Sequence, residues 1–376
     1  MNQLFTHKLT KGLALIGLCF CWLVGYYLNK SSQEQRLEPY MNGDNLTFES
    51  VTANIYSIND QASSYHLLAT EAKGYGGIIQ VIIKTNTAGI IDRVILGEHN
   101  ETPSYLNKLI NKKYLEQFEN LPITDPNYFG SVNAISGATT SSTAIKNAVL
   151  LAAEEYNVEV LQQEAGQFKP TIMYQFGLAE VTAIALLLVY FLVRVIRKVP
   201  QKRMQQFATL ISLILLGFVF NQSIGLSRLV GMLSGWLPPL AINLAFYLLL
   251  GSTLVIILWK KENFYCQWAC PFGGAQNAIS SLTNANKKMI HQLTWIPKLF
   301  TWLALAIAFL FRSPELTDYT IFSALFDFTA GDFIFILLAI TMMTSIFLHR
   351  PWCRYLCPVG EIFNTLIAIH KAILPK

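Results

Sequence analysis

The chain has 376 residues, of which 53% are hydrophobic and 14% are charged, and its net charge is +5. Soluble domains carry about 25% charged residues, so this composition excludes an ordinary soluble protein and favours a membrane protein. The basic residues lie at the ends of apolar runs without any nucleic-acid-reading module, so the positive charge does not indicate nucleic-acid binding.

The apolar runs predict six membrane-spanning helices. Each run approaches the ~20 residues that cross a ~30 Å hydrocarbon layer. The first is followed by the polar stretch NKSSQEQR without an A-x-A-like cleavage site, so we interpret it as an uncleaved anchor and not as a signal peptide. The runs are 12–28, 174–196, 206–226, 238–259, 295–312 and 331–348.

A polar stretch of strand-like and turn-like segments separates the first run from the second. The sequence therefore predicts an N-terminal transmembrane anchor over 1–29, a soluble domain over 30–170 and a helical transmembrane domain over 171–376. The expected fold class is an α+β domain inserted between transmembrane helix 1 and a five-helix transmembrane domain.

Lysine and arginine predict the orientation, because they are enriched in short cytoplasmic loops. The loop RVIRKVPQKR (194–203) and the loop after the fourth span are basic, whereas the opposite loops contain little more than Arg228 and Arg312. We therefore expect both termini in the cytoplasm of a bacterium and the soluble domain on the outer side, which is the periplasm if the chain lies in the inner membrane.

The soluble domain contains several recognisable elements. The segment ESVTANIYSI (49–58) is strand-like, and two β-rich runs, 78–85 and 90–96, flank a polar turn with Gly89 and predict a hairpin. A polar stretch over 105–120 is expected to be helical. Helical spacing of apolar residues predicts a helix over 141–162, and the residues that carry this spacing are Ile145, Val149, Leu150, Ala153 and Val158.

The stretch SGATTSS, residues 136–142, precedes that helix. Ser and Thr are favoured helix caps, but one cap needs one hydroxyl and this stretch has five. A helix N-terminus also binds phosphate, Gly137 and Ala138 let a bulky ligand approach the backbone, and a threonine hydroxyl beside a phosphate can be esterified to it. The residues alone leave three interpretations: a plain cap, a non-covalently bound cofactor or a covalently attached one.

Four of the six cysteines form two Cys-x-x-x-Cys-Pro motifs at predicted cytoplasmic ends of spans: Cys266 with Cys270, and Cys353 with Cys357. Residues i and i+4 lie on one face of a helix, so we expect two pairs to point four thiolates at one site. The cytoplasm, which these cysteines are expected to face, is reducing and therefore disfavours disulfides. The thiolates suit an iron–sulfur cluster or a structural zinc, or they carry no metal.

The remaining cysteines and the tryptophans have plainer interpretations. Cys19 and Cys21 lie within the first span and are expected to face the core or the lipid. Trp236, Trp268 and Trp352 fit an aromatic belt at the membrane interface.

The motif S-G-A-T resembles the flavinylation motif of FMN-binding domains in the C and G subunits of sodium-pumping NADH:quinone reductase and its Rnf relative. In that family the last threonine, here Thr139, carries FMN through a phosphoester bond made by a flavin transferase. The family also has a Gly-Tyr-x-Gly segment and a Glu-Thr-Pro segment, matched here by residues 74–77 and 101–103, and usually an aspartate where this chain has Asn133. The resemblance implies FMN contacts at Gly76, Glu101, Thr102, Ser136, Gly137, Ala138 and Thr140.

An FMN-binding domain followed by spans with two Cys-x-x-x-Cys-Pro motifs resembles the NosR/NirI family of membrane flavoproteins, which are linked to nitrous oxide and nitrite reduction. Longer members carry a C-terminal ferredoxin domain. This chain ends at Lys376 without one, so we expect it to be closer to the short PceC type found beside reductive dehalogenases.

The resemblance implies a membrane electron-transfer flavoprotein. Electrons would pass between a cytoplasmic-side cluster, expected to be [4Fe–4S], and periplasmic FMN on Thr139. The implied partners are a quinone pool or cytoplasmic donor and a periplasmic reductase. The sequence shows no set of acid, base and nucleophile residues that would form a catalytic site, so we do not predict a stand-alone enzyme. Two alternatives stay open: a membrane-bound redox sensor or regulator, and a structural assembly factor with zinc at the four cysteines.

Overall fold

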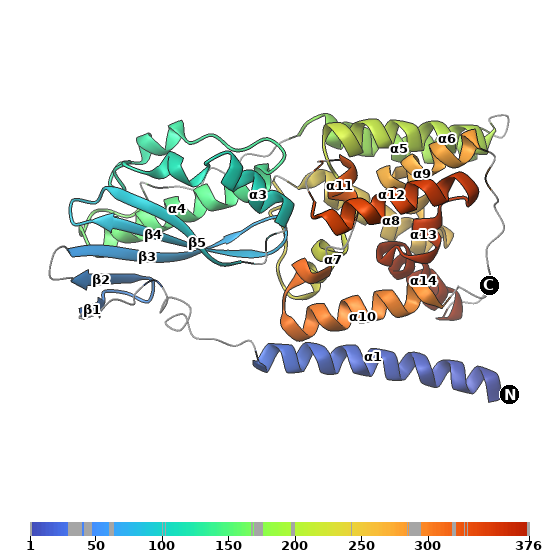
Figure 1. The fold of residues 1–376 in the computed structure, drawn as a ribbon, viewed down its shortest axis with the longest axis horizontal. Helices are drawn as coiled ribbons and strands as arrows, with labels where there is room; N and C mark the ends of the chain where they lie inside the picture. The colour runs from blue at the N-terminus through green and yellow to red at the C-terminus, as the bar shows by residue number, and fades with distance from the viewer. Residues whose placement is uncertain are drawn as a thin grey trace. The chain divides into compact units, whose positions relative to one another are not determined.

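The computed structural model describes residues 2–28, 40, 47–59, 64–99, 101, 103–166, 168, 176–196, 200–241, 243–283, 285, 295–317, 321–326, 328 and 330–373. The chain divides into two compact units (Figure 1). An α+β unit comprises Tyr27–Met173 with Gly231–Pro239, and a helical unit comprises Met1–Tyr26, Tyr174–Val230 and Leu240–Lys376.

The α+β unit is built on a five-stranded antiparallel sheet whose strands follow their chain order, β1-β2-β3-β4-β5. The predicted hairpin is confirmed: β4 pairs with β5, and Gly89 in the turn has a φ of +74°, which costs glycine nothing. The strands are β1 (Thr47–Ser50), β2 (Ile55–Asn59), β3 (Ser64–Lys73), β4 (Ile78–Asn86) and β5 (Ile91–His99).

Helices cover one face of this sheet. Helix α4 (Thr139–Glu159) packs across β3 and β4, where Val81 of β4 joins Ile145 and Val149 in the main core (Figure 1). Ile82, the next residue of β4, lies in a second cluster with Leu67 and Ile58, because successive side chains of a strand point to opposite faces. The shorter helices of this unit are α3 (Pro103–Asn111), η1 (Leu115–Phe118) and η2 (Pro126–Ser131).

The helical unit holds α1 up to Tyr26 and the helices from α5 onward, except the end of α7, which belongs to the α+β unit from Gly231. Two short stretches, η3 and η4, are π-helical. The elements are α1 (Asn2–Leu28), α5 (Leu178–Val195), α6 (Gln201–Ser212), η3 (Leu213–Val219), α7 (Leu226–Leu233), α8 (Leu244–Lys260), η4 (Tyr265–Ala269), α9 (Pro271–Leu282), α10 (Ile296–Phe311), η6 (Pro314–Thr317), α11 (Phe322–Phe326), α12 (Asp332–Phe347), α13 (Pro351–Tyr355) and α14 (Pro358–Ile373).

Among the described residues, α5 is the one helix that meets both the length and the hydropathy expected of a membrane span, and four apolar helices are shorter. Two predicted spans differ from the observed helices. The run 238–259 contains a helix only from Leu244, because Pro238 and Pro239 disfavour helical geometry before it. The run 206–226 stops being helical after η3. The six-span topology therefore stays a prediction.

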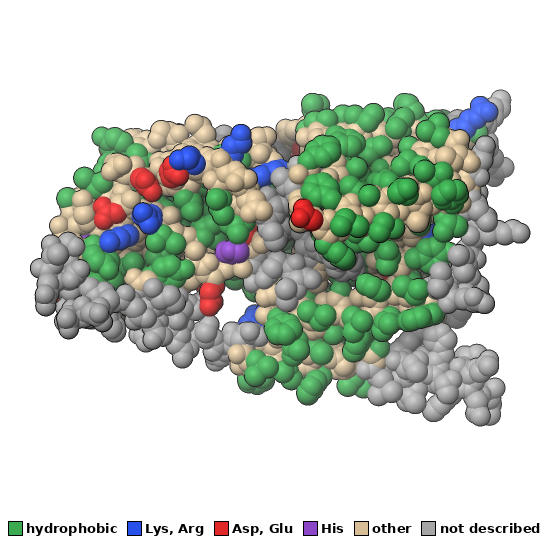
Figure 2. All heavy atoms as spheres, in the orientation of Figure 1, with side chains coloured by type: hydrophobic (Ala, Val, Ile, Leu, Met, Phe, Trp, Pro, Cys, Tyr) green, Lys and Arg blue, Asp and Glu red, His purple; other side chains and the backbone are tan. Residues whose placement is uncertain are grey.

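Large apolar side chains are exposed on several of these helices. Leu188 of α5 is 56% exposed, Leu258 of α8 is 63% exposed and Phe347 of α12 is 73% exposed. Figure 2 shows hydrophobic side chains over much of the visible face of the helical unit. Soluble monomers rarely expose apolar patches of this kind, so this surface suits an apolar surrounding.

Polar contacts join the ends of several helices. Arg194 at the end of α5 pairs with Glu262 after α8. Gln205 in α6 donates to the carbonyl of Gln267 at 3.1 Å, and Arg350 after α12 donates to that of Cys266 at 3.2 Å. Arg194, Gln205, Arg350 and the segment 262–267 therefore share one end of the helical unit.

Candidate functional site

Three motifs of the α+β unit meet at one buried carboxylate. Glu101 is 1% exposed. Its Oε1 accepts the backbone N–H of Gly76 at 2.9 Å, and its Oε2 accepts the N–H of Tyr75 at 2.9 Å and the hydroxyl of Ser141 at 2.6 Å. A buried carboxylate requires such donors. Glu101 thus ties the glycine-rich segment after β3 to the first turn of α4.

Gly74 leaves the room that this carboxylate needs. A Cβ on Gly74 would lie 2.3 Å from Oε2 of Glu101 and 2.6 Å from Cδ1 of Ile79. Both distances are far below van der Waals contact, so a side chain at position 74 would displace Glu101. Gly74, the first residue of the Gly-Tyr-x-Gly segment, is therefore required by the packing of Glu101 and Ile79.

Helix α4 begins without a side-chain cap. Its N-cap is Ala138, and no side chain accepts a hydrogen bond there. Thr139, Thr140 and Ser141 form the first helical positions, whose amides have no acceptor within a helix. This geometry argues against the plain-cap interpretation of SGATTSS, because no side chain of the stretch caps the first amides of α4.

The hydroxyls of the stretch have separate roles. Ser141 bonds Glu101, and Ser142 accepts the N–H of Ile135 at 3.1 Å and donates to the carbonyl of Ala138 at 2.9 Å. Thr139 Oγ1 donates a longer bond of 3.4 Å to the carbonyl of Ile135. Ser141 was not among the predicted site residues, although it lies two positions after the threonine of the motif.

Aromatic and basic side chains lie near this helix start. The rings of Tyr75 and Tyr105 are 4.3 Å apart between centroids. Lys108 Nζ lies 3.4 Å from the carbonyl oxygen of Gly137, to which it donates a hydrogen bond. A helix start with uncapped amides and a neighbouring cation suits a phosphate group, and the half-buried ring of Tyr75, which packs on the core residue Tyr105, is the aromatic side chain near it, so the residues present fit FMN.

The other predicted residues of this site have different outcomes. Ser136 and Gly137 are exposed, Thr139 and Thr140 are half-buried, and Gly137 has a φ of +77°. Thr102 lies outside the described residues. Asn133 is exposed, and its amide donates to the carbonyl of Ser131 at 3.1 Å, so its hydrogen bond serves the loop before α4.

Each Cys-x-x-x-Cys-Pro motif breaks its helix before the second cysteine, which corrects the expectation of a pair on one helical face. Cys270 is extended, with φ −75° and ψ 116°, and α9 starts at the following proline. Proline disfavours helical geometry in the residue before it and favours the first position of a helix. Cys357 likewise precedes Pro358, the first residue of α14.

The second cysteine of each motif instead accepts a hydrogen bond at the start of the next helix. The backbone N–H of Gly273 donates to Sγ of Cys270, and that of Gly360 donates to Sγ of Cys357, both at 3.4 Å. The spacing Cys-Pro-x-Gly is the same in both motifs. The two motifs therefore build the same local structure twice, with a sulfur at a helix N-terminus.

The four thiols lie close together. Sγ of Cys357 and Sγ of Cys266 lie 3.7 and 3.8 Å from the position that a Cβ on Gly360 would occupy. Burial raises the pKa of all four thiols, that of Cys357 to about 12, and the charges of Cys357, Cys270 and Cys353 raise the pKa of Cys266 further. Four thiolates at this site therefore need a bound cation.

Four thiolates can bind a single zinc ion, with each sulfur ~2.3 Å from the metal, or an iron–sulfur cluster whose several irons they share. Among the described residues, no group of three or more His, Cys, Asp or Glu side chains is placed to hold a metal ion as it stands.

Buried donors next to the cysteines fit an iron–sulfur cluster. Nε2 of Gln276 and Nε of Arg350 are buried without an acceptor. Both residues contact the motifs, since Oε1 of Gln276 accepts the N–H of Cys353 at 3.5 Å and Arg350 donates to the carbonyl of Cys266. Buried polar groups normally have partners, and the sulfurs of a cluster would supply them.

Two tryptophans, one at each cysteine motif, are more buried than expected. Trp268 is fully buried and its ring packs edge-on against Tyr190, so it does not belong to an interfacial belt. Trp352 of the second motif is also fully buried, against Phe272. The hydroxyl of Tyr265 accepts the N–H of Ile224 at 2.9 Å. Hydrogen bonding from Tyr265 lowers the pKa of Cys270 against the larger, opposite effect of burial.

The remaining cysteines stand apart in α1, where Cys19 is exposed and Cys21 is half-buried.

Comparison with known families agrees with both candidate sites, the helix start at Thr139 and the four cysteines. The FMN-binding domain family matches residues 74–154, which contain Glu101 and Thr139. The 4Fe-4S binding domain family matches residues 242–289 and 331–376, which contain the four cysteines.

Two curated proteins are similar over about a third of the chain or more. YccM of Escherichia coli (strain K12), named as an electron transport protein, is 27% identical over 155 residues, which are 36% of this chain and 42% of YccM. Protein NirI of Paracoccus denitrificans (strain Pd 1222) is 27% identical over 169 residues, which are 40% of this chain and 24% of NirI. The chain thus spans less than half the length of these relatives. No solved structure matches it.

The described geometry and the two family matches agree on an FMN-binding domain followed by a 4Fe-4S binding domain in one chain. The chain is similar to YccM and NirI, and this similarity fits the expected NosR/NirI-like family.

Proposed function

We propose that this protein is a membrane electron-transfer flavoprotein that passes electrons between a [4Fe–4S] cluster on the cytoplasmic side and an FMN covalently bound to Thr139 on the periplasmic side. The observation that carries the proposal is the presence of both sites in one chain. One is an uncapped helix start beside Thr139, and the other is a group of four thiols with two Cys-Pro helix starts. Cofactors of these classes carry electrons, while the protein supplies their position and electrostatic surroundings.

On the flavin side, the amides of the first turn of α4 would hold the phosphate, and the Thr139 hydroxyl would form the phosphoester bond. Glu101 acts through Ser141, Tyr75 and Gly76, which it fixes around the helix start. Attachment requires a separate flavin transferase, as the family resemblance implies. The matched FMN-binding domain supports the site.

On the cluster side, Cys266, Cys270, Cys353 and Cys357 would bind iron. The N–H groups of Gly273 and Gly360 would stabilise two of the thiolates. Cys270 and Cys357 are buried, whereas Cys266 and Cys353 are half-buried.

Several features support the membrane topology. Arg194, Gln205 and Arg350 share one end of the helical unit with the first cysteine motif. In α1, the carbonyl of Ala14 accepts from Trp302 of α10 at 3.0 Å, and Gly25 packs on the carbonyl of Phe309, so α1 runs in the same direction as α10. With the basic loops on the cytoplasmic side, these contacts support a position of the four cysteines at the cytoplasmic surface. Reporter fusions test it: a fusion after Gly43 should be active only outside and one after Asn286 only inside, and activity of both on one side would contradict the topology.

The proposed partners are a quinone pool or a cytoplasmic donor on one side and a periplasmic or membrane-attached reductase on the other. A ~30 Å hydrocarbon layer is too thick for one electron hop, so transfer across it requires a closer approach of the two cofactors or a further carrier.

Potentiometric titration of the full chain, purified without oxygen after co-expression with a flavin transferase, tests the carrier function. We expect reversible flavin absorption changes and a reversible cluster signal in electron paramagnetic resonance. A structural assembly factor would show neither. A sensor would show both signals but would not pass electrons, so reduction of the FMN by a donor confined to the cytoplasmic side of membrane vesicles, lost in Cys353→Ser, separates carrier from sensor.

A further inference from the structure

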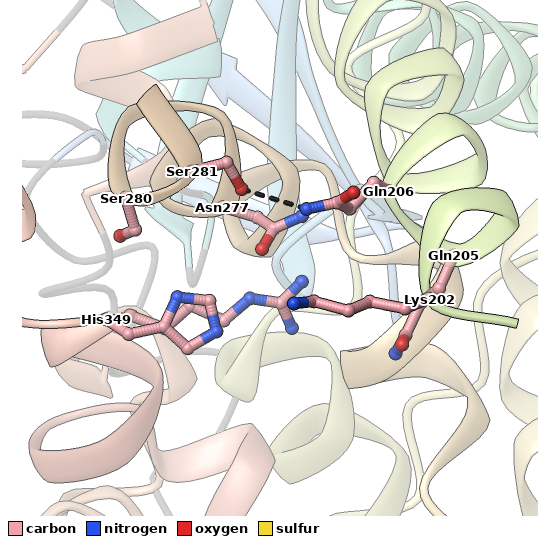
Figure 3. A pocket seen from close by; sticks show the side chains of 8 residues that line it. Lys202, Gln205, Gln206, Asn277, Ser280, Ser281 and His349 are labelled. Carbon is pink, nitrogen blue, oxygen red and sulfur yellow. Dashed lines mark hydrogen bonds between the residues drawn. The ribbon is translucent and has the colours of Figure 1, made fainter. Parts of the chain in front are cut away.

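The helical unit contains a cavity of about 230 Å³ whose walls are polar and basic. It is formed by α6, α9 and the segment between α12 and α13. Lys202 and Gln206 line it from α6, Asn277 and Ser281 from α9, and His349 and Arg350 from the segment after α12. In Figure 3 the side chains of Lys202 and His349 reach toward the same space from opposite sides.

The charges of this cavity are unbalanced. Lys202 and Arg350 are both positive at neutral pH. The charge of Arg350 also acts on the thiols of Cys270 and Cys353, whereas Lys202 has no ion-pair partner in the described part of the chain. No carboxylate is present among the described residues that line the cavity. Two cations around one space repel each other unless an anion lies between them.

The other lining groups are amides, hydroxyls and an imidazole, which can each donate a hydrogen bond. The side chain of Gln206 is held by a bond of 3.1 Å to Ser281, and the amide of Asn277 and the hydroxyl of Ser281 face the same cavity. Nδ2 of Asn277 already donates to the hydroxyl of Thr209 at 3.4 Å, so the groups that favour an anion are the ammonium of Lys202 and the guanidinium of Arg350. The lining residues come from three separate segments.

Size and polarity decide the class of ligand. Pockets for drug-sized molecules have about 300–1,000 Å³ and are lined mainly by apolar and aromatic side chains. This cavity is smaller, and its lining side chains are polar or charged throughout. A quinone ring does not fit such a lining, whereas a phosphate group does, because Lys and Arg bind phosphate strongly and its oxygens accept many bonds.

We propose that this cavity is a phosphate-binding site, for the phosphate of a membrane phospholipid headgroup or of a soluble phosphate compound. Arg350 joins it to the first cysteine motif through its bond to the Cys266 carbonyl, so the site lies at the end of the helical unit that carries the cysteines. Binding there needs neither flavin nor iron.

Titration calorimetry on the full chain, purified in detergent and stripped of lipid, tests the proposal with two probes. Inorganic phosphate represents the soluble source, and dihexanoyl phosphatidylglycerol below its micellar concentration represents the lipid source. Saturable binding of either probe is expected, and the probe that binds identifies the source. Lys202→Gln should weaken that binding at least about tenfold, as expected for loss of a hydrogen bond between charged groups.

The matched control is Arg203→Gln, which removes the same charge at the neighbouring exposed position and does not line the cavity. We expect its affinity to equal that of the unchanged protein. Ser281→Ala, a smaller change on α9, should weaken binding without loss of charge. Absence of saturable binding with both probes would overturn the proposal, and so would equal weakening by Lys202→Gln and Arg203→Gln, because that result would reflect only general surface charge.

Discussion

The two units of the protein use helix N-termini in opposite ways. In the α+β unit, α4 starts at Ala138 with no side-chain cap, so its first amides stay available. In the helical unit, α9 and α14 start after Cys270 and Cys357, whose sulfurs accept the N–H of a glycine three residues later. The first arrangement leaves the helix start open to the phosphate of a ligand, whereas the second stabilises a cysteine thiolate of the protein itself. The predictions below test this difference.

The largest effect is expected at Thr139. Thr139→Ala should abolish flavin fluorescence of the denatured full chain on a gel after co-expression with a flavin transferase, because the hydroxyl that forms the ester is gone. Thr139→Ser should retain part of it, and Thr140→Ala is the matched control with full fluorescence. Fluorescence of the Ala variant would move the attachment point to Thr140 or Ser141.

A comparable loss is expected in the helical unit from a single sulfur. Cys270→Ser should remove most of the bound iron, because a hydroxyl is a poor ligand for a cluster held by thiolates. Cys19→Ser changes an exposed cysteine of α1 and should leave iron content unchanged. Iron analysis after anaerobic purification distinguishes them, and equal iron in both variants would remove Cys270 from the ligand set.

A smaller effect is expected where packing and not chemistry supports the α4 start. Gly74→Ala puts a Cβ 2.3 Å from Glu101 Oε2, and such overpacking costs about 1–3 kcal/mol of the free energy of unfolding. Gly130→Ala has no atom within 4 Å of its Cβ and should change stability by less than about 0.5 kcal/mol. Thermal unfolding of the full chain followed by flavin fluorescence compares the two variants, and equal midpoints would show that Glu101 is not fixed in this position.

The smallest effect is a pH dependence of the α+β unit. Burial lowers the pKa of His66 below its usual 6.5, so the unfolded chain binds a proton at a pH where the folded chain does not, and stability falls as the pH drops below about 6.5. His66→Phe keeps the ring contact with Tyr156, whose centroid lies 5.5 Å away, and should flatten the decline between pH 7 and 5. His99, whose pKa burial also lowers, should leave a residual slope. An unchanged slope in the variant would contradict the role of His66.

Much of this arrangement could be predicted from the sequence because its signals are local. The turn at Gly89, the helix after SGATTSS and the repeated Cys-Pro motif each depend on a few adjacent residues. Strand β3 gave a weak signal, since three consecutive residues, Leu67 to Ala69, are buried and the period of two is lost.

Other features depend on contacts that sequence spacing does not reveal. Ser141 reaches Glu101 across 40 positions of the chain, and Arg350 reaches the Cys266 carbonyl across 84. The break in each cysteine motif could have been foreseen, because a proline after the second cysteine disfavours helical geometry there. The full burial of Trp268 and Trp352 could not, since it depends on how several helices pack.

The most direct test of the account is the content of iron, acid-labile sulfide and zinc in the full chain, purified without oxygen after co-expression with a flavin transferase. The account predicts about four irons and four sulfides per chain at the four cysteines, as in a [4Fe–4S] cluster, together with flavin that stays attached on a denaturing gel. Zinc at one atom per chain without iron or sulfide would contradict the electron-carrier function and would favour a structural role for the cysteines.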